Sequence, residues 1–226
     1  MIYFLDTANL DAIRKAVDLY PLDGVTTNPS IVAKENKPLK EIMLSIREII
    51  GKERLLHVQV MGKTAEIMLQ EAEAMRAIDP DLYIKVPVTP QGIKAMKLMS
   101  EKNIPITATA ILTPQQALMA AKAGAEYLAP YVNRLDNICG DGVQVVAEIA
   151  HLLEVHNLEN AKVLAASFKN VQQVHEVARA GSKSVTIAPD VFDLLLNHPL
   201  TDSGVAGFVA DWESVYGEGT NVLDVL

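Results

Sequence analysis

The sequence predicts an α/β protein built as a (β/α)8 TIM barrel, and three observations lead to this prediction. Short apolar runs typical of buried strands alternate with longer segments of helical periodicity. Eight such strand-and-helix units occur, and the 226 residues suit one barrel. Because strands that alternate with helices pair in parallel through right-handed crossovers, eight units most simply close into a barrel.

The predicted strands are apolar runs, each followed by a helical segment. In chain order they are Ile2–Asp6 (IYFLD), Gly24–Thr27 (GVTT), Leu55–Val60 (LLHVQV), Tyr83–Val88 (YIKVPV), Pro105–Thr109 (PITAT), Tyr127–Val132 (YLAPYV), Lys162–Ser167 (KVLAAS) and Ser184–Ala188 (SVTIA). Thr89-Pro90 and Thr113-Pro114 predict helix starts, with a capping threonine followed by proline. Gly124 and Gly181 predict helix ends, and the similar segments around them suggest one repeated unit.

The alternative to a barrel is a doubly wound open sheet. Such a sheet normally carries a glycine-rich loop after its first strand, whereas the first strand here runs into LDTANLD without any glycine. No linker or composition break interrupts the chain, so residues 1–226 are predicted to form one domain. Residues 201–226 are predicted to be a helix and a glycine-containing tail that belong to it.

Composition restricts the partners and the location of the protein. The net charge of −8 disfavours binding to nucleic acid and to anionic membranes. The single cysteine, Cys139, excludes a disulfide within the chain and fits a reducing cytoplasm. The N-terminus does not resemble a signal peptide, and no apolar run reaches the roughly 18 residues of a membrane span. We therefore expect a cytoplasmic protein that binds neither nucleic acid nor membrane, although a local basic pocket for a small anion is still allowed.

Polar residues cluster where the predicted strands end. In a barrel the carboxyl ends of the strands form the active-site mouth. Polar ends of single strands are common, so the convergence carries the prediction and no single residue does. The polar residues at or near these ends are Asp6, Thr26, Thr27, Asn28, Gln59, Lys85, Thr107, Thr109, Tyr131, Asn133, Arg134, Ser167 and Thr186.

Lys85 interrupts the apolar strand YIKVPV, although lysine is almost never fully buried without a partner or a purpose. It could be a snorkelling or ion-paired lysine at a strand edge. Its apolar neighbours, and Asp6 at the same mouth, favour catalysis instead. Burial disfavours the ammonium, and a neutral amine is a nucleophile that forms a Schiff base with a carbonyl.

Other candidates have structural alternatives that the sequence leaves open. Asp6 could be the N-cap of a helix over Asn9–Leu19. Thr26–Ser30 (TTNPS) could be only a turn before a helix. Arg134 could pair with Asp136 at the surface, and Ser167 could be a small strand-end residue or a helix cap.

Motifs for metals and cofactors are missing from the sequence. The five histidines are scattered, and no two stand at ligand spacing such as HExxH. No phosphate-binding glycine loop and no Gly-x-Ser-x-Gly elbow occurs. We therefore expect no cofactor and no metal.

Several motifs, spread along nearly the whole chain, resemble one family. They are LDTAN (Leu5–Asn9), DGVTTNPS (Asp23–Ser30), IKVPVTPQGIKA (Ile84–Ala95), AGAEYLAPYVNRLD (Ala123–Asp136) and KVLAASFKN (Lys162–Asn170). The sequence is thereby similar to the small transaldolase-like family of class I aldolases. The resemblance implies a (β/α)8 barrel whose Schiff-base lysine is Lys85.

The same resemblance implies roles for other residues. Asp6 would transfer protons, and Thr26 and Asn28 would hold the hydroxyls of a dihydroxyacetone unit. Thr109 would help to position the catalytic water. Arg134 and Ser167 would bind the phosphate of the acceptor.

Two positions separate the branches of this family. Transaldolases generally carry a glutamate on strand three and a phenylalanine on strand six, where this sequence has Gln59 and Tyr131. Both resemble the fructose-6-phosphate aldolase branch. The resemblance thus implies reversible cleavage of fructose 6-phosphate to dihydroxyacetone and glyceraldehyde 3-phosphate, with Gln59 and Tyr131 tuning the water. Transaldolase exchange and a non-catalytic sugar-phosphate-binding barrel are the alternatives.

The resemblance also implies a homo-oligomer, a decamer, in which the C-terminal helix reaches a neighbouring subunit.

Overall fold

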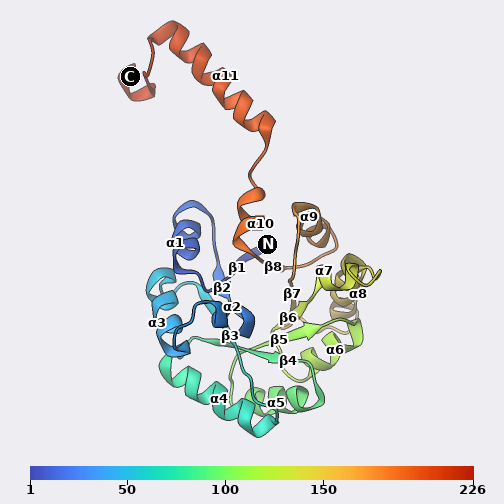
Figure 1. Ribbon diagram of the computed structural model, residues 1–226. Coiled ribbons are helices and arrows are strands. Elements are labelled where there is room, and N and C mark those ends of the chain that lie inside the picture. The colour runs from blue at the N-terminus through green and yellow to red at the C-terminus, as the bar shows by residue number, and fades with distance from the viewer. The chain divides into compact units, whose positions relative to one another are not determined.

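The computed structural model describes all residues, Met1–Leu226, and its first unit is a closed barrel of eight parallel strands (Figure 1). Each strand pairs with the next, and the last closes on the first. The predicted (β/α)8 class is therefore confirmed. The strands are β1 (Ile2–Asp6), β2 (Gly24–Thr26), β3 (Leu55–Gln59), β4 (Tyr83–Pro87), β5 (Ile106–Ile111), β6 (Tyr127–Pro130), β7 (Lys162–Ala165) and β8 (Ser184–Ile187).

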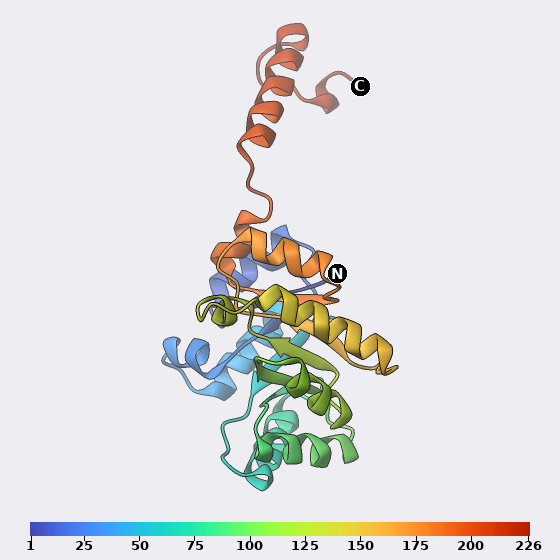
Figure 2. The same ribbon diagram turned by 90° about the vertical axis from the view of Figure 1, so that its right-hand side faces the viewer.

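Helices follow the strands and lie outside them, as both ribbon views show (Figures 1 and 2). The barrel helices are α1 (Leu10–Leu19), α2 (Pro29–Lys34), α3 (Leu39–Ile50), α4 (Ala65–Ile78), α5 (Pro90–Glu101), α6 (Pro114–Lys122), α7 (Val132–Asp136), α8 (Gly142–Val155), α9 (Val171–Arg179) and α10 (Pro189–Leu194). Two helices follow β2 and two follow β6. The alternation of strand and helix is therefore kept along the barrel, with an extra short helix, α2 or α7, after each of these two strands.

The predicted helix boundaries that rest on capping chemistry are confirmed. Thr89 and Thr113 are N-caps whose hydroxyls accept backbone N–H bonds, and each is followed by proline in the first turn. Gly124 and Gly181 directly follow the C-caps of α6 and α9 with φ of 100° and 95°. Only glycine adopts such angles without strain, which explains why the two helix ends look alike in the sequence.

Seven of the eight predicted strand ends differ from the structure by one or two residues, and two of these differences have a clear structural cause. The fifth strand extends to Ile111 because a bulge at Ala110 (φ 59°) shifts its register on β6 and pairing then resumes. The sixth strand ends at Pro130, because Tyr131 is already the N-cap of α7. A single bridge between Tyr131 and Ala166 continues the parallel pairing by one residue.

The interior of the barrel is filled below the mouth by aromatic side chains. Phe4, Tyr127 and Leu164 form a buried cluster, and the imidazole of His57 stacks on Tyr83 with ring centroids 4.8 Å apart. His57 is buried, and burial, followed by the charges of Lys85 and Lys162, lowers its pKa well below the ordinary value. These packed, uncharged side chains fill the barrel beneath the polar residues at the carboxyl ends of the strands.

The C-terminal segment Asp193–Leu226 forms a second compact unit, distinct from Met1–Phe192. It contains α11 (Pro199–Tyr216) and the short helix η1 (Val222–Asp224), coloured red in Figure 2. The prediction that residues 201–226 belong to the barrel domain stays a prediction. No helix in the chain combines the length and the apolar character that a membrane crossing needs.

Candidate active site

A pocket of about 390 Å³ opens at the carboxyl ends of the barrel strands. It brings together side chains that are far apart in the sequence, as the polar strand ends predict. Eight of the nine predicted site residues line it, namely Asp6, Asn28, Gln59, Lys85, Thr109, Tyr131, Arg134 and Ser167. The ninth, Thr26, is fully buried outside the pocket lining, and its hydroxyl donates a hydrogen bond to Asp6.

Lys85 lies in the pocket with only 5% of its surface exposed, so it is not a snorkelling lysine. Its Nζ donates a hydrogen bond of 2.7 Å to the backbone carbonyl of Thr27. Burial lowers the pKa of this amine, and the negative charge of Asp6 offsets only part of that shift. The pocket therefore favours the neutral, nucleophilic form of the amine more than water does.

Asp6 ends β1 and accepts a hydrogen bond of 2.7 Å from the Thr26 hydroxyl. Thr26 is also 2.6 Å from the hydroxyl of Thr186 on β8. The alternative role of Asp6 as a helix cap is wrong. Asn9 caps α1 instead, since its side chain accepts from the Ala12 N–H at 2.9 Å.

Another part of the pocket lining comes from β5 and from the start of α7. The hydroxyls of Thr109 and Tyr131 lie 3.1 Å apart, and the guanidinium of Arg134 lies 4.5 Å above the Tyr131 ring. The sequence left open an ion pair between Arg134 and Asp136, and the structure does not contain it. The Asp136 carboxylate instead accepts from the N–H of Gly142 and the side chain of Gln173. The forked donor of Arg134 thus lines the pocket.

Asn28 and Ser167 also lie in the pocket. The side-chain oxygen of Asn28 caps α2 by accepting from Ile31 at 3.1 Å, so the turn predicted from TTNPS is correct and leaves the amide NH2 for a ligand. Ser167 is not a cap, because Asn170 caps α9. Ser167 has a φ of 65°, and Ala110 in the same pocket has 59°. Strained backbone of this kind concentrates at functional sites.

The pocket also contains residues to which the sequence assigned no role. Ser30, Ala129 and Thr186 line it. Thr186 stood among the polar strand-end residues, but nothing in the sequence shows that it meets a threonine from β2. That pairing requires the closure of β8 onto β1, which only the fold supplies.

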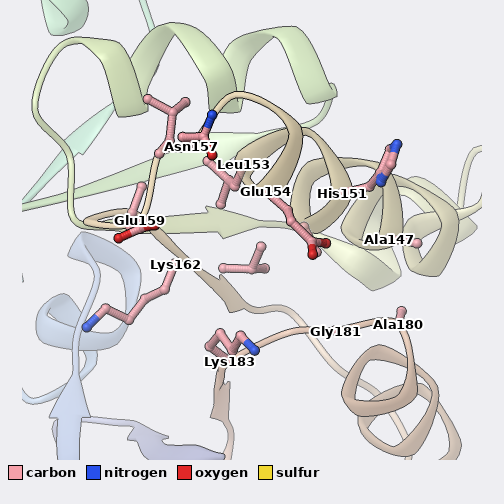
Figure 3. Close-up of a pocket in the computed structure, with 14 residues that line it drawn as sticks. Ala147, His151, Leu153, Glu154, Asn157, Glu159, Lys162, Ala180, Gly181 and Lys183 are labelled. Atoms are coloured by element: carbon pink, nitrogen blue, oxygen red, sulfur yellow. The ribbon is translucent and has the colours of Figure 1, made fainter.

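A larger hollow of about 730 Å³ lies at the other end of the strands, between α8 and the starts of β7 and β8. Figure 3 shows the side chains of Glu154 and Lys183 directed toward it. Both charged residues are exposed, and no predicted site residue lines this hollow. The 390 Å³ pocket therefore remains the candidate site, in keeping with the general position of active sites in barrels. No group of three His, Cys, Asp or Glu side chains is placed to hold a metal ion.

Comparison with known proteins identifies the family of the chain. Residues 3–219 match the family model described as transaldolase/fructose-6-phosphate aldolase. A "probable transaldolase" of Geobacillus sp. (strain WCH70) is 42% identical over 212 residues, which cover 94% of this chain and 98% of that protein. A "probable transaldolase" of Nitrosopumilus maritimus (strain SCM1) is 38% identical over 222 residues, covering 98% of this chain and 99% of the relative.

Solved structures with little sequence similarity share the fold. Flavocytochrome b2 with sulfite bound has a TM-score of 0.60 at 13% identity, covering 83% of this chain and 56% of that one. Thiamine phosphate pyrophosphorylase from Pyrococcus furiosus has a TM-score of 0.59 at 16% identity, covering 83% and 84%. At such identities the similarity concerns the barrel alone.

The barrel and the family match together define an aldolase-like enzyme. The chain belongs to the transaldolase/fructose-6-phosphate aldolase family.

Proposed function

We propose that the protein is a class I aldolase that reversibly cleaves fructose 6-phosphate to dihydroxyacetone and glyceraldehyde 3-phosphate. The observation that carries this proposal is the buried amine of Lys85, which donates to the Thr27 carbonyl and has a lowered pKa. Gln59 and Tyr131, which resemble the aldolase branch, line the same pocket.

In the proposed reaction the neutral Lys85 amine attacks the C2 carbonyl of the ketose, and loss of water gives an iminium ion. A base removes the C4 hydroxyl proton, the C3–C4 bond breaks, and its electron pair moves into the iminium to form an enamine. Glyceraldehyde 3-phosphate leaves. Water held by Gln59, Thr109 and Tyr131 then protonates the enamine at C3, and hydrolysis frees dihydroxyacetone and the lysine.

The remaining residues bind the substrate in this proposal. Asp6 assists the proton transfers around the imine, and Thr26 supports it. Asn28 contacts the hydroxyls of the dihydroxyacetone unit, and Arg134 and Ser167 bind the phosphate. The reaction uses no metal and no organic cofactor, because the covalent iminium serves as the electron sink.

Transaldolase activity is the second candidate, and the names of the relatives favour it. In that reaction the enamine waits for an aldose phosphate instead of being protonated and released. Incubation with fructose 6-phosphate alone, and then with erythrose 4-phosphate added, separates the two. Product in the first incubation supports the aldolase, and product only in the second contradicts it.

Borohydride trapping tests the Schiff base itself. The protein is incubated with dihydroxyacetone and borohydride, and the peptide that contains Lys85 is examined by mass spectrometry. We expect a stable adduct on Lys85, none in a Lys85→Ala variant, and an unchanged adduct in Lys94→Ala, which removes an exposed lysine of α5. Absence of the adduct in the native protein would contradict the mechanism and favour a non-catalytic binding barrel.

We also propose that copies of the chain assemble through α11. Val205, Phe208, Val209, Trp212, Val215 and Tyr216 follow helical spacing along one face of this helix. Phe208 and Val215 are 74% and 73% exposed in the single chain. Contiguous exposed apolar residues mark protein interaction sites, and a second copy of the chain fits the expected homo-oligomer. The cytoplasmic location stays a prediction from the sequence.

A further inference from the structure

Asp6 belongs to a short chain of hydrogen-bonding side chains that comes from three neighbouring strands. β1 pairs with β2 on one side and with β8 on the other. Thr26 on β2 and Thr186 on β8 meet at 2.6 Å, and Thr26 lies 2.7 Å from Asp6 Oδ1. In the strand register Thr186 lies opposite Phe4, two residues before Asp6, so the pair of hydroxyls supports the carboxylate from the barrel side.

The direction of these bonds follows from counting protons. A threonine hydroxyl has one proton, and an ionised carboxylate can only accept. Thr26 must therefore donate to Asp6 when Asp6 is ionised, and Thr186 must donate to Thr26. Thr26 is fully buried and does not line the pocket, so water cannot readily replace Thr186 as its partner.

Protonation of Asp6 on Oδ1, the oxygen that Thr26 contacts, reverses the chain. The carboxylic acid then donates to Thr26, and the Thr26 proton must turn to another acceptor. Thr186 is the acceptor at hand, since its hydroxyl oxygen lies within hydrogen-bonding distance. Without the Thr186 hydroxyl, protonation of Asp6 on Oδ1 would leave the buried Thr26 O–H group unpaired, which is costly.

We infer that Thr186 is a positioning residue that acts on Asp6 through Thr26 and allows Oδ1 of Asp6 to carry a proton without leaving a buried hydroxyl unpaired. This inference rests on the proposed function, in which Asp6 takes up and returns protons during turnover. The role differs from substrate binding because removal of the hydroxyl affects steps that protonate Asp6 and leaves ground-state binding unchanged.

Thr186→Val tests the inference, since valine keeps the shape and removes the hydroxyl. We expect kcat for fructose 6-phosphate to fall about tenfold or more, because a buried donor is left unpaired, while KM changes less than about twofold. Thr186→Ser retains the hydroxyl and should bring kcat back to within about threefold of the native value. Ser184→Ala is the matched control: it removes another buried hydroxyl of β8, which bonds to Val163 outside the pocket, and should leave kcat unchanged.

A native kcat in Thr186→Val overturns the inference, and so does a loss of kcat that Thr186→Ser does not restore. A raised KM at unchanged kcat also overturns it, because that pattern indicates substrate binding alone. If the valine variant does not fold, Thr186→Ala takes its place in the same comparison. Borohydride trapping on Lys85 in the native protein separates the two proposals: no adduct contradicts the proposed function, whereas an adduct together with a native kcat in Thr186→Val contradicts only the role of Thr186.

Discussion

The Nζ of Lys85 on β4 lies 2.7 Å from the backbone carbonyl oxygen of Thr27, which directly follows β2. The carbonyl oxygen accepts a hydrogen bond from the amine and thereby fixes the position of the nitrogen in the pocket. In its neutral form the amine keeps a lone pair for a ligand. A backbone acceptor, unlike a carboxylate, gives the ammonium no full opposite charge, so burial still lowers the pKa.

This burial predicts how stability depends on pH. The unfolded chain keeps a lysine pKa near the ordinary 10.5, whereas the folded protein has a lower value at Lys85. Between the two values the unfolded state binds more protons, so the free energy of unfolding should rise with pH. The penalty for burying the ammonium is complete below the folded pKa and disappears as the pH approaches 10.5.

Urea denaturation at several pH values, compared with Lys85→Met, measures this effect. The native protein should gain stability relative to Lys85→Met as the pH rises from about 7 to about 10. Lys94→Met, at an exposed position on α5, should run parallel to the native protein. A native curve that also runs parallel to Lys85→Met would contradict the lowered pKa.

The bond between Thr109 and Tyr131 predicts a change in the ratio of the two candidate reactions. Tyr131→Phe removes the hydroxyl that lies 3.1 Å from Thr109 and so removes one anchor for water. We expect cleavage of fructose 6-phosphate alone to fall about tenfold or more, since a general acid–base group contributes at least this much. Transfer to erythrose 4-phosphate does not pass through protonation of the enamine by water and should be retained.

The control for this variant is Tyr83→Phe, which removes a hydroxyl that bonds to Glu126 outside the pocket. Its ratio of cleavage to transfer should equal that of the native protein. Equal losses of cleavage and transfer in Tyr131→Phe would show that the phenol serves a step common to both reactions, and the assigned role would be wrong.

The sequence predicted the barrel well because its strand signals are local. Apolar runs, capping threonines and the two helix-ending glycines depend on neighbouring residues, and all eight strands occur near their predicted positions. The end of β5 could not be predicted, because the bulge at Ala110 depends on pairing with β6. The short helix α7 was missed for a similar reason, since YLAPYV is one continuous apolar run in which Tyr131 begins the helix only through its tertiary setting.

The candidate site shows the same division. The positions of the polar residues at strand ends follow from the strand assignment, so eight of nine line one pocket. Their partners do not follow from it. The Thr27 carbonyl bond to Lys85 and the Thr26–Thr186 pair join different strands, and they appear only once the sheet closes. The Arg134–Tyr131 stack is local, but it requires the short helix α7, which the sequence did not predict.

Arg134 predicts a selective effect on phosphorylated substrates. Its guanidinium stacks on Tyr131 and has no carboxylate partner in the chain, which leaves its donors for an anion. We expect Arg134→Ala to raise KM for fructose 6-phosphate by about ten- to a hundredfold, the usual scale for hydrogen bonds to a charged group. The rate of borohydride trapping with unphosphorylated dihydroxyacetone should stay native.

Arg14→Ala, at an exposed position on α1, is the control and should change neither quantity. Arg134→Lys separates charge from geometry, because lysine supplies a point charge without the forked donors. Loss of dihydroxyacetone trapping in Arg134→Ala would place Arg134 at the Schiff-base end of the pocket and contradict phosphate binding.

The apolar face of α11 predicts that assembly can be disrupted without damage to the barrel. Phe208 is 74% exposed and lies at the centre of that face, three residues from Val205 and four from Trp212. A carboxylate placed there would be buried without a partner in any interface that the face forms, and such burial is strongly unfavourable. We therefore expect Phe208→Asp to reduce the assembled mass in sedimentation experiments, whereas Asp202→Asn, a polar change in the first turn of the same helix, should leave it unchanged.

Borohydride trapping on Lys85 should remain native in Phe208→Asp, because every lining residue of the pocket lies within Met1–Phe192. If Phe208→Asp retains the native mass, the face is not the contact between copies.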